Sequence, residues 1–247
     1  MYFLGTDNGM IGNLIPFIFF VCIYVFCDKN NSRGLRLFIV ASIISLVTII
    51  IVGSATGLFV LLIQLAFTVI YTILKKTKIP YRLAIGVYCA FFILVIVLNS
   101  NSYIITFVSQ ILGRSGTFTG RSTLWAKAIE EIAQRPLFGY GYSGGNINIW
   151  SGTYSSHNMF LEMMIQGGVF YLALFVFVTF VAIKRLRKAS VALGNSIFLG
   201  LYCFLLKGLM ETELSEIYFI LLIFAYYSKK IDVQFQNYKY LYMNRKD

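Results

Sequence analysis

The chain has 247 residues, of which 58% are hydrophobic and 13% are charged, and its formal net charge is +11. This composition excludes an ordinary soluble globular domain and is typical of an integral membrane protein. Hydrophobic runs also recur too often for a signal peptide followed by a soluble domain.

Continuous hydrophobic runs predict membrane-spanning helices, since about 20 helical residues cross a bilayer core. The last run is short, so its helix is expected to begin earlier, near Glu211, or to tilt little. The sequence therefore predicts an all-α polytopic bundle of about seven transmembrane helices that forms one membrane domain over 1–247. The runs lie near 10–27, 37–53, 57–74, 83–99, 163–183, 190–209 and 214–228.

The basic residues concentrate in every second connection between these runs, at 28–36, 75–82, 184–188 and in the tail from Lys229. Cytoplasmic loops carry such an excess of lysine and arginine. The pattern predicts a multi-pass protein of the cell membrane with an external N-terminus, an external loop over about 100–162 and a cytoplasmic C-terminus. Because membrane topology explains the basic excess, nucleic-acid binding is not expected.

The external loop contains a predicted amphipathic helix. Residues 119–122 have the composition of a helix start, apolar residues follow at helical spacing over 124–132, and Pro136 ends the run. Trp125 is expected at the level of the lipid headgroups. Arg121 would lie in the first turn, where its guanidinium and the free backbone N–H groups can face an anion together.

Arginines and tyrosines of the loop are candidates for binding a phosphorylated sugar. Arg114, Arg121 and Arg135 each offer a planar fork of donors that matches phosphate oxygens. The Gly-rich segment 139–145 follows a helix and a proline rather than a strand, so it is not a dinucleotide-binding loop. Its tyrosines, Tyr140 and Tyr142, can stack on sugar faces, and an interfacial aromatic belt is the alternative interpretation.

The only histidine of the chain, His157, closes the loop. Ser155 or Ser156 is expected to cap a helix that starts at His157 and continues into the fifth hydrophobic run. A helix N-terminus favours the neutral imidazole, which can accept a proton and so suits a general base. Glu162 is expected to bind a sugar hydroxyl or to orient an arginine. The alternative for His157 is a polar interfacial residue, and with no second histidine a protein-bound metal is not expected.

The external loop contains four short motifs: Gly120-Arg121-Ser122-Thr123-Leu124-Trp125, Arg135-Pro136-Leu137-Phe138-Gly139-Tyr140-Gly141, Ser156-His157-Asn158-Met159-Phe160-Leu161-Glu162 and Gly167-Gly168. Together they resemble the signature of the O-antigen ligase and polymerase superfamily. Each motif is weak alone, but their order, spacing and placement in one external loop are specific together. The resemblance is sharp over about 113–168 and topological elsewhere.

The resemblance implies a glycosyltransferase that needs no metal or cofactor and whose sugar donor is linked to undecaprenyl diphosphate. Arg121 would contact the diphosphate, and His157 would activate or position the acceptor hydroxyl. The implied partners are undecaprenyl-diphosphate-linked oligosaccharide and membrane lipid, with a chain-length regulator and a flippase as further candidates. The remaining candidates for binding the diphosphate or the glycan are Arg114, Arg135, Asn158, Glu162, Tyr140 and Tyr142.

The favoured activity is that of a polymerase that joins repeat units into O-antigen, capsular polysaccharide or exopolysaccharide. One alternative is an O-antigen ligase that transfers the glycan to a lipid A core. Another is a flippase for lipid-linked oligosaccharide, which predicts charges deep inside several spans. Here Lys207 is the clear deep charge, and it is interpreted as the i,i+4 partner of Glu211.

Two features depart from the family pattern. Members usually have more spans ahead of the large loop, so the chain is expected to be the C-terminal part of a longer enzyme, a truncated reading frame or a divergent short member. Many members also carry an arginine in the turn that matches Ser54-Ala55-Thr56, where this chain has Ala55. Arg114 is the expected substitute.

Overall fold

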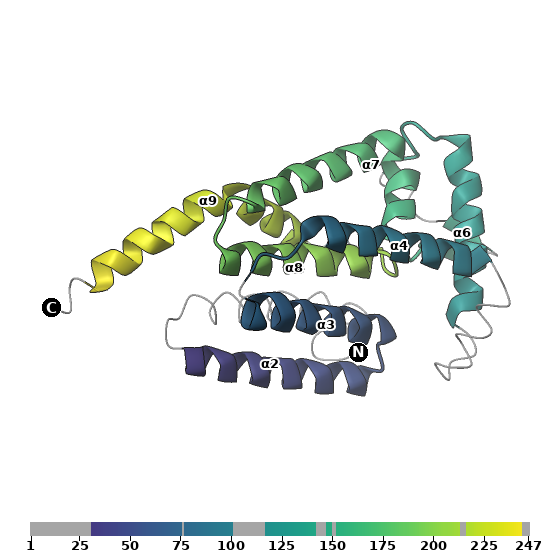
Figure 1. Cartoon of the computed structure of the whole chain (residues 1–247). Helices are drawn as coiled ribbons and strands as arrows, with labels where there is room; N and C mark the ends of the chain where they lie inside the picture. The colour runs from purple at the N-terminus through teal and green to yellow at the C-terminus, as the bar shows by residue number, and fades with distance from the viewer. Residues whose placement is uncertain are drawn as a thin grey trace. The chain divides into compact units, whose positions relative to one another are not determined.

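The computed structural model describes residues 31–75, 77–100, 117–141, 147–149, 152–212 and 216–243. These residues are mainly helical, as predicted. A short antiparallel hairpin, which was not predicted, precedes α7 in the sequence and pairs β1 (Ile147–Ile149) with β2 (Gly152–Tyr154). The helices are α2 (Asn31–Val52), α3 (Ala55–Phe67), the π-helix η1 (Thr68–Leu74), α4 (Tyr81–Ser100), α6 (Thr117–Gln134), α7 (Met159–Leu186), α8 (Val191–Gly208) and α9 (Glu216–Met243) (Figure 1).

The described helices overlap the predicted hydrophobic runs, except that α6 is the predicted amphipathic helix. The run 10–27 lies outside the described residues. By length and composition, Met159–Leu186 and Val191–Gly208 are long and apolar enough to cross a membrane. The prediction that the last helix begins near Glu211 is wrong. It begins at Glu216, where an acidic residue in the first turn complements the helix dipole.

Contacts divide the described residues into two compact units. The first takes 31–79, 177–207 and 216–243, and the second takes 80–176 and 208–212. Helix α7 therefore contributes residues 177–186 to the first unit and residues 159–176 to the second.

In the first unit, a tight turn joins α2 to α3. Gly53 adopts a left-handed conformation with φ 69°, and Ser54 caps α3 by accepting a hydrogen bond from the Gly57 N–H group at 3.2 Å. The buried core of this unit includes most of α8, and Lys207 lies buried in the last turn of that helix.

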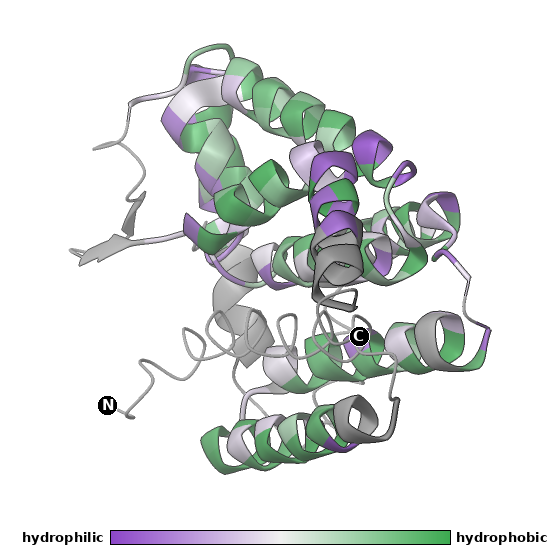
Figure 2. Cartoon of the chain, turned by 90° about the vertical axis from the view of Figure 1, so that its left-hand side faces the viewer, coloured by the Kyte–Doolittle hydropathy of each residue, from purple (hydrophilic) through white to green (hydrophobic). Residues whose placement is uncertain are grey.

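Helix α7 presents large apolar side chains at its surface, among them Phe170, Leu174 and Phe180. The hydropathy colouring shows apolar residues along most of this helix (Figure 2). An exposed apolar surface of this extent is unusual on a soluble monomer. It is the surface that a helix in contact with lipid requires.

Candidate functional site

Asn158 shapes the start of α7. Its Oδ1 atom accepts hydrogen bonds from the backbone N–H groups of Phe160 and Leu161 at 3.0 and 3.2 Å. A capping side chain of this kind satisfies N–H groups that have no partner in the first turn. Helix α7 therefore begins at Met159. The prediction that a serine caps a helix starting at His157 is wrong.

His157 lies just before the helix and has a left-handed backbone, with φ 49°. Among the described residues, no other non-glycine has a positive φ. A β-carbon makes this conformation costly by about 1–2 kcal/mol, and strained residues of this kind cluster at functional sites. The His157 N–H group donates to Ser155 Oγ at 3.3 Å, which supports the turn.

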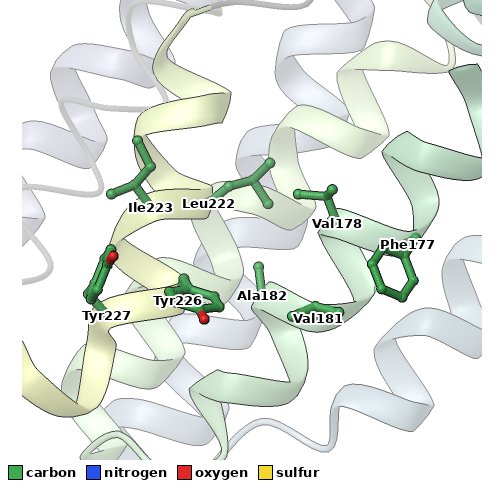
Figure 3. Close-up of a pocket in the computed structure, with 8 residues that line it drawn as sticks. All are labelled: Phe177, Val178, Val181, Ala182, Leu222, Ile223, Tyr226 and Tyr227. Carbon is green, nitrogen blue, oxygen red and sulfur yellow. The ribbon is translucent and has the colours of Figure 1, made fainter.

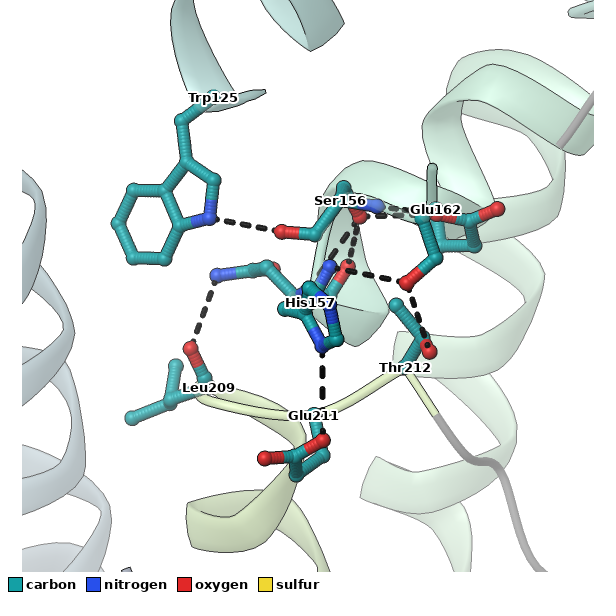
Figure 4. A network of polar contacts seen from close by, with 9 residues as sticks. Trp125, Ser156, His157, Glu162, Leu209, Glu211 and Thr212 are labelled. Atoms are coloured by element: carbon teal, nitrogen blue, oxygen red, sulfur yellow. Dashed lines mark hydrogen bonds and ion pairs between the residues drawn. The ribbon is translucent and has the colours of Figure 1, made fainter. Parts of the chain in front are cut away.

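The imidazole of His157 faces the carboxylate of Glu211 (Figure 4). Nδ1 of the ring lies 3.7 Å from Glu211 Oε2, and the two side chains are 44% and 11% exposed. A carboxylate beside one ring nitrogen favours the tautomer with the proton on that nitrogen. The other nitrogen, Nε2, is then the proton acceptor that the site can offer to a substrate.

Two contacts hold the segment that carries Glu211 beside the histidine. Asn158 Nδ2 donates to Leu209 O at 3.2 Å, across 51 positions of the sequence. Ser155 Oγ and Thr212 Oγ1 are 3.3 Å apart. Because Glu211 lies between Leu209 and Thr212, both ends of its short segment are fixed relative to the residues around His157.

Ser156, the residue before His157, is fully buried and is held on two sides. Glu162 Oε2 accepts a hydrogen bond from the Ser156 N–H group at 3.1 Å and lies 2.8 Å from Ser156 Oγ. From α6, Trp125 Nε1 donates to Ser156 O at 2.8 Å (Figure 4). Trp125 was expected at headgroup level but is 6% exposed. Its indole is buried in the second unit, and its hydrogen bond holds the residue that precedes His157.

Arg121 lies in α6, one helical turn before Trp125. Because α6 begins at Thr117, Arg121 stands about one turn deeper in the helix than predicted. The hydrogen bond from Trp125 connects this helix to the residue before His157. Arg114 and Tyr142, two further predicted ligands, lie outside the described residues.

Arg135 and Tyr140 pack against each other beyond the end of α6. The Arg135 guanidinium carbon lies 4.8 Å from the centre of the Tyr140 ring. The Tyr140 hydroxyl is 3.2 Å from Glu131 Oε2 and from Gln134 Oε1. Burial, followed by the hydrogen bond to Glu131, raises the pKa of Tyr140. The predicted role of both residues in glycan binding remains a prediction.

The motif over 135–141 docks on a break in α7 that is visible as a bend in Figure 1. Gly168 causes the break with φ 63° and ψ −161°. The loop satisfies backbone groups that the break removes from the helical pattern. Three hydrogen bonds of 2.8 Å connect the two backbones: Tyr140 N–H to Ile165 O, Gly141 N–H to Gln166 O, and Val169 N–H to Pro136 O.

The arrangement around His157 can support proton abstraction. Nε2 can accept a proton while the Glu211 carboxylate at Nδ1 stabilises the resulting charge. Within the part of the chain that the structure describes, no group of three or more His, Cys, Asp or Glu residues is placed to hold a metal ion.

Sequence reasoning proposed His157, Asn158 and Glu162 as site residues, but it did not place Glu211 or Trp125 beside this segment. Glu211 was predicted to pair with Lys207, and Trp125 was predicted to lie at the level of the lipid headgroups. The available signal for Glu211 was its place in an acidic connection on the same predicted side of the membrane as the large loop.

These observations define a helical protein with membrane-type helices and a polar histidine–carboxylate site at the head of one of them. The family model described as Wzy_C, O-antigen ligase, matches residues 40–176. The match covers more than half of the chain, and the chain belongs to this family, which confirms the resemblance seen in the sequence. Neither a curated protein nor a solved structure gives a significant match.

The family covers O-antigen ligases and polymerases, which are membrane-associated, glycosyltransferase-like enzymes that use lipid-linked glycans. The matched range includes Arg121, His157 and Glu162, whereas Glu211 lies beyond it. The carboxylate partner of His157 is therefore known from the structure and lies outside the residues that the family model matches.

Proposed function

We propose that the chain is a polysaccharide polymerase that joins undecaprenyl-diphosphate-linked repeat units into O-antigen, capsular polysaccharide or exopolysaccharide. The observation that carries the proposal is the 3.7 Å approach of His157 Nδ1 to Glu211 Oε2 in a member of a glycan ligase and polymerase family. This pair supplies a base of the kind that glycosyl transfer to a hydroxyl needs.

In the proposed reaction, a hydroxyl of one lipid-linked repeat attacks the anomeric carbon of the glycan on a second carrier. The new glycosidic bond forms as the bond between the anomeric carbon and the diphosphate oxygen breaks, and undecaprenyl diphosphate leaves with the electron pair. The hydroxyl proton passes to His157 Nε2, and Glu211 stabilises the imidazolium. Arg121 is assigned to the negative charge that develops on the diphosphate.

The other predicted residues take supporting roles in this proposal. Arg114 and Arg135 are further diphosphate contacts, and Tyr140 and Tyr142 contact sugar. Asn158 and Glu162 are assigned as positioning residues. This refines their prediction as substrate ligands, because each makes several hydrogen bonds to the segments around His157.

We place the enzyme in the inner or plasma membrane as a multi-pass protein, with the N-terminus and large loop external and the C-terminus cytoplasmic. The basic segments on alternate connections support this orientation. A chain-length regulator and a flippase are the protein partners that such an activity calls for.

The sharpest test is His157→Asn at the native locus. Asparagine tolerates the left-handed backbone that alanine would strain, so this variant removes the base and keeps the turn. Surface and lipid-linked glycans are compared on gels, with membrane levels measured in parallel. The matched control is Lys127→Gln, because Lys127 makes surface ion pairs with Glu130 and Glu131 that contribute little to stability.

If the chain is a polymerase, His157→Asn should lose the long glycan chains. Single repeats should still be displayed, and the level of the protein in the membrane should stay normal. Long chains stranded on the lipid carrier, with none on the lipid A core, would identify a ligase. Repeats retained on the cytoplasmic face would identify a flippase. An unchanged profile would contradict the site assignment.

Glu211 is tested by a double-mutant cycle. Glu211→Gln preserves the size of the side chain and removes its charge, so chain synthesis should fall. In a His157→Asn background it should cause little further loss, because residues that act as a unit are strongly non-additive. Additive losses would show that Glu211 does not act through the imidazole.

A further inference from the structure

An open apolar pocket of about 320 Å³ lies in the first unit between α7 and α9 (Figure 3). Helix α7 contributes Phe177, Val178 and Val181, and α9 contributes Ile223, Tyr226 and Tyr227. The volume is in the range of small-ligand sites, which begins at about 300 Å³. The two tyrosine hydroxyls are the polar groups of these six side chains.

The floor of the pocket is formed by Ala182 and Leu222, which are 2% and 6% exposed. Ala182 has the smallest side chain of the eight residues that line the pocket (Figure 3). Apart from the two tyrosine hydroxyls, the lining side chains offer no hydrogen bond to a polar ligand, and they suit a hydrocarbon chain.

Helices α7 and α9 run in the same direction along this pocket. Thr179 Oγ1 lies 2.7 Å from Tyr218 Oη, and further along both helices Arg185 Nη2 donates to Tyr226 Oη at 3.5 Å. The basic C-terminal part of α7 therefore lies beside the basic middle part of α9, at the tyrosine end of the pocket.

Two cations are held against the tyrosines at that end. The Arg185 guanidinium carbon lies 4.6 Å from the centre of the Tyr226 ring, and Lys230 Nζ lies 5.5 Å from the centre of the Tyr227 ring. Both cationic side chains are on exposed residues. The pocket is thus apolar, and two cations contact the rings of the tyrosines that line it.

We propose that this pocket binds an anionic phospholipid, with one acyl chain in the apolar body and the phosphate between Arg185 and Lys230. Charge complementarity selects this occupant, since basic side chains next to a membrane attract anionic headgroups. Tyrosines are also favoured where hydrocarbon meets headgroup. The pocket belongs to the first unit and the His157 site to the second, so the inference does not depend on the proposed glycosyl transfer.

The test uses the purified full chain, delipidated in detergent and titrated with dioleoylphosphatidylglycerol or dioleoylphosphatidylcholine. These lipids share acyl chains and differ in headgroup charge. Native mass spectrometry counts the bound lipids. The wild type should prefer the anionic lipid, and Arg185→Gln with Lys230→Gln should weaken its binding about fivefold for each charge removed.

The matched control is Lys184→Gln with Lys229→Gln. It removes two exposed charges from positions next to Arg185 and Lys230 on the same helices, and it should retain the preference for the anionic lipid. Equal loss in both double variants would overturn the proposal, because it would show diffuse attraction rather than a site. Equal binding of both lipids by the wild type would overturn it as well.

The apolar body is tested separately by Val181→Trp, which fills the pocket and should weaken binding of both lipids. Phe180→Trp is its control, because Phe180 is the neighbouring residue, is 60% exposed and does not line the pocket. Unchanged binding in Val181→Trp would overturn the placement of the acyl chain. Displacement of phosphatidylglycerol by lower concentrations of undecaprenyl phosphate would show that the pocket serves the carrier lipid instead.

Discussion

Glu162 holds Ser156 with a single carboxylate oxygen, which accepts from the Ser156 N–H group at 3.1 Å and lies 2.8 Å from its hydroxyl oxygen. The serine hydroxyl also lies 2.9 Å from Asn158 O. Ser156 directly precedes His157. The Glu162 carboxylate therefore fixes the backbone just before the strained histidine. Glu162 thus acts on the site through a neighbour's backbone.

The first prediction concerns this contact. Glu162→Ala should lower the free energy of unfolding by about 1–3 kcal/mol, because it leaves a buried N–H group of Ser156 without its acceptor. Glu162→Gln retains an acceptor and should lose less. Urea unfolding in detergent measures both. If Glu162→Ala abolished glycan chains and left stability unchanged, Glu162 would be a substrate ligand, as the sequence first suggested.

Asn158 combines two functions that substitutions can separate. Asn158→Ser keeps a capping oxygen and loses the hydrogen bond to Leu209 O, whereas Asn158→Ala loses both. The alanine variant should be less stable than the serine variant by about 1 kcal/mol, the usual contribution of an N-cap. The serine variant should already synthesise fewer chains, because the segment carrying Glu211 loses a tether. Wild-type synthesis by Asn158→Ser would contradict the tether.

The break in α7 makes a steric prediction. A β-carbon on Gly168 would collide with the backbone of Leu137, whereas one on Gly141 would meet nothing within 4 Å. Both glycines have positive φ. Gly141→Ala should therefore cost only the left-handed penalty of about 1–2 kcal/mol, and Gly168→Ala should cost clearly more. Thermal unfolding of the two variants provides the comparison, and equal losses would argue against the docked loop.

Because the pKa of Tyr140 is raised in the folded protein, the stability of the protein should depend on pH in the alkaline range. Burial and the bond to Glu131 raise its pKa in the folded protein, so the unfolded chain releases this proton first as the pH rises. The stability from Tyr140 is then fully present below about pH 10 and is lost as the pH rises through the folded pKa. Tyr140→Phe should show a shallower loss of stability above pH 10, whereas Tyr171→Phe controls for loss of a phenol. Parallel curves for the wild type and Tyr140→Phe would contradict this prediction.

The sequence predicted the helices well because hydropathy and helix-ending residues act locally. The apolar run over 163–183 lies within α7, and α6 ends just before Pro136, as expected. The cap was missed by a few positions because Ser155, Ser156 and Asn158 are all good capping residues. Only the three-dimensional arrangement decides which of them meets the first free N–H groups.

The site was predicted less completely than the helices, for a physical reason. The contact between His157 and Glu211 depends on two segments brought together by Asn158 and Leu209, and no periodicity links them. Trp125 was misassigned because a tryptophan near a membrane suits either an interface or a buried hydrogen bond. The placement of Arg121 in α6 agrees with the sequence, although the helix begins earlier than predicted.

Hydrogen bonds anchor the large loop at two places. Upstream, Tyr140 and Gly141 are bonded to the break in α7, and downstream Ser156 is bonded to Trp125 and Glu162. These contacts hold the chain on both sides of the stretch between them. Under the proposed function, sequence changes in that stretch alter sugar recognition before they alter the site around His157.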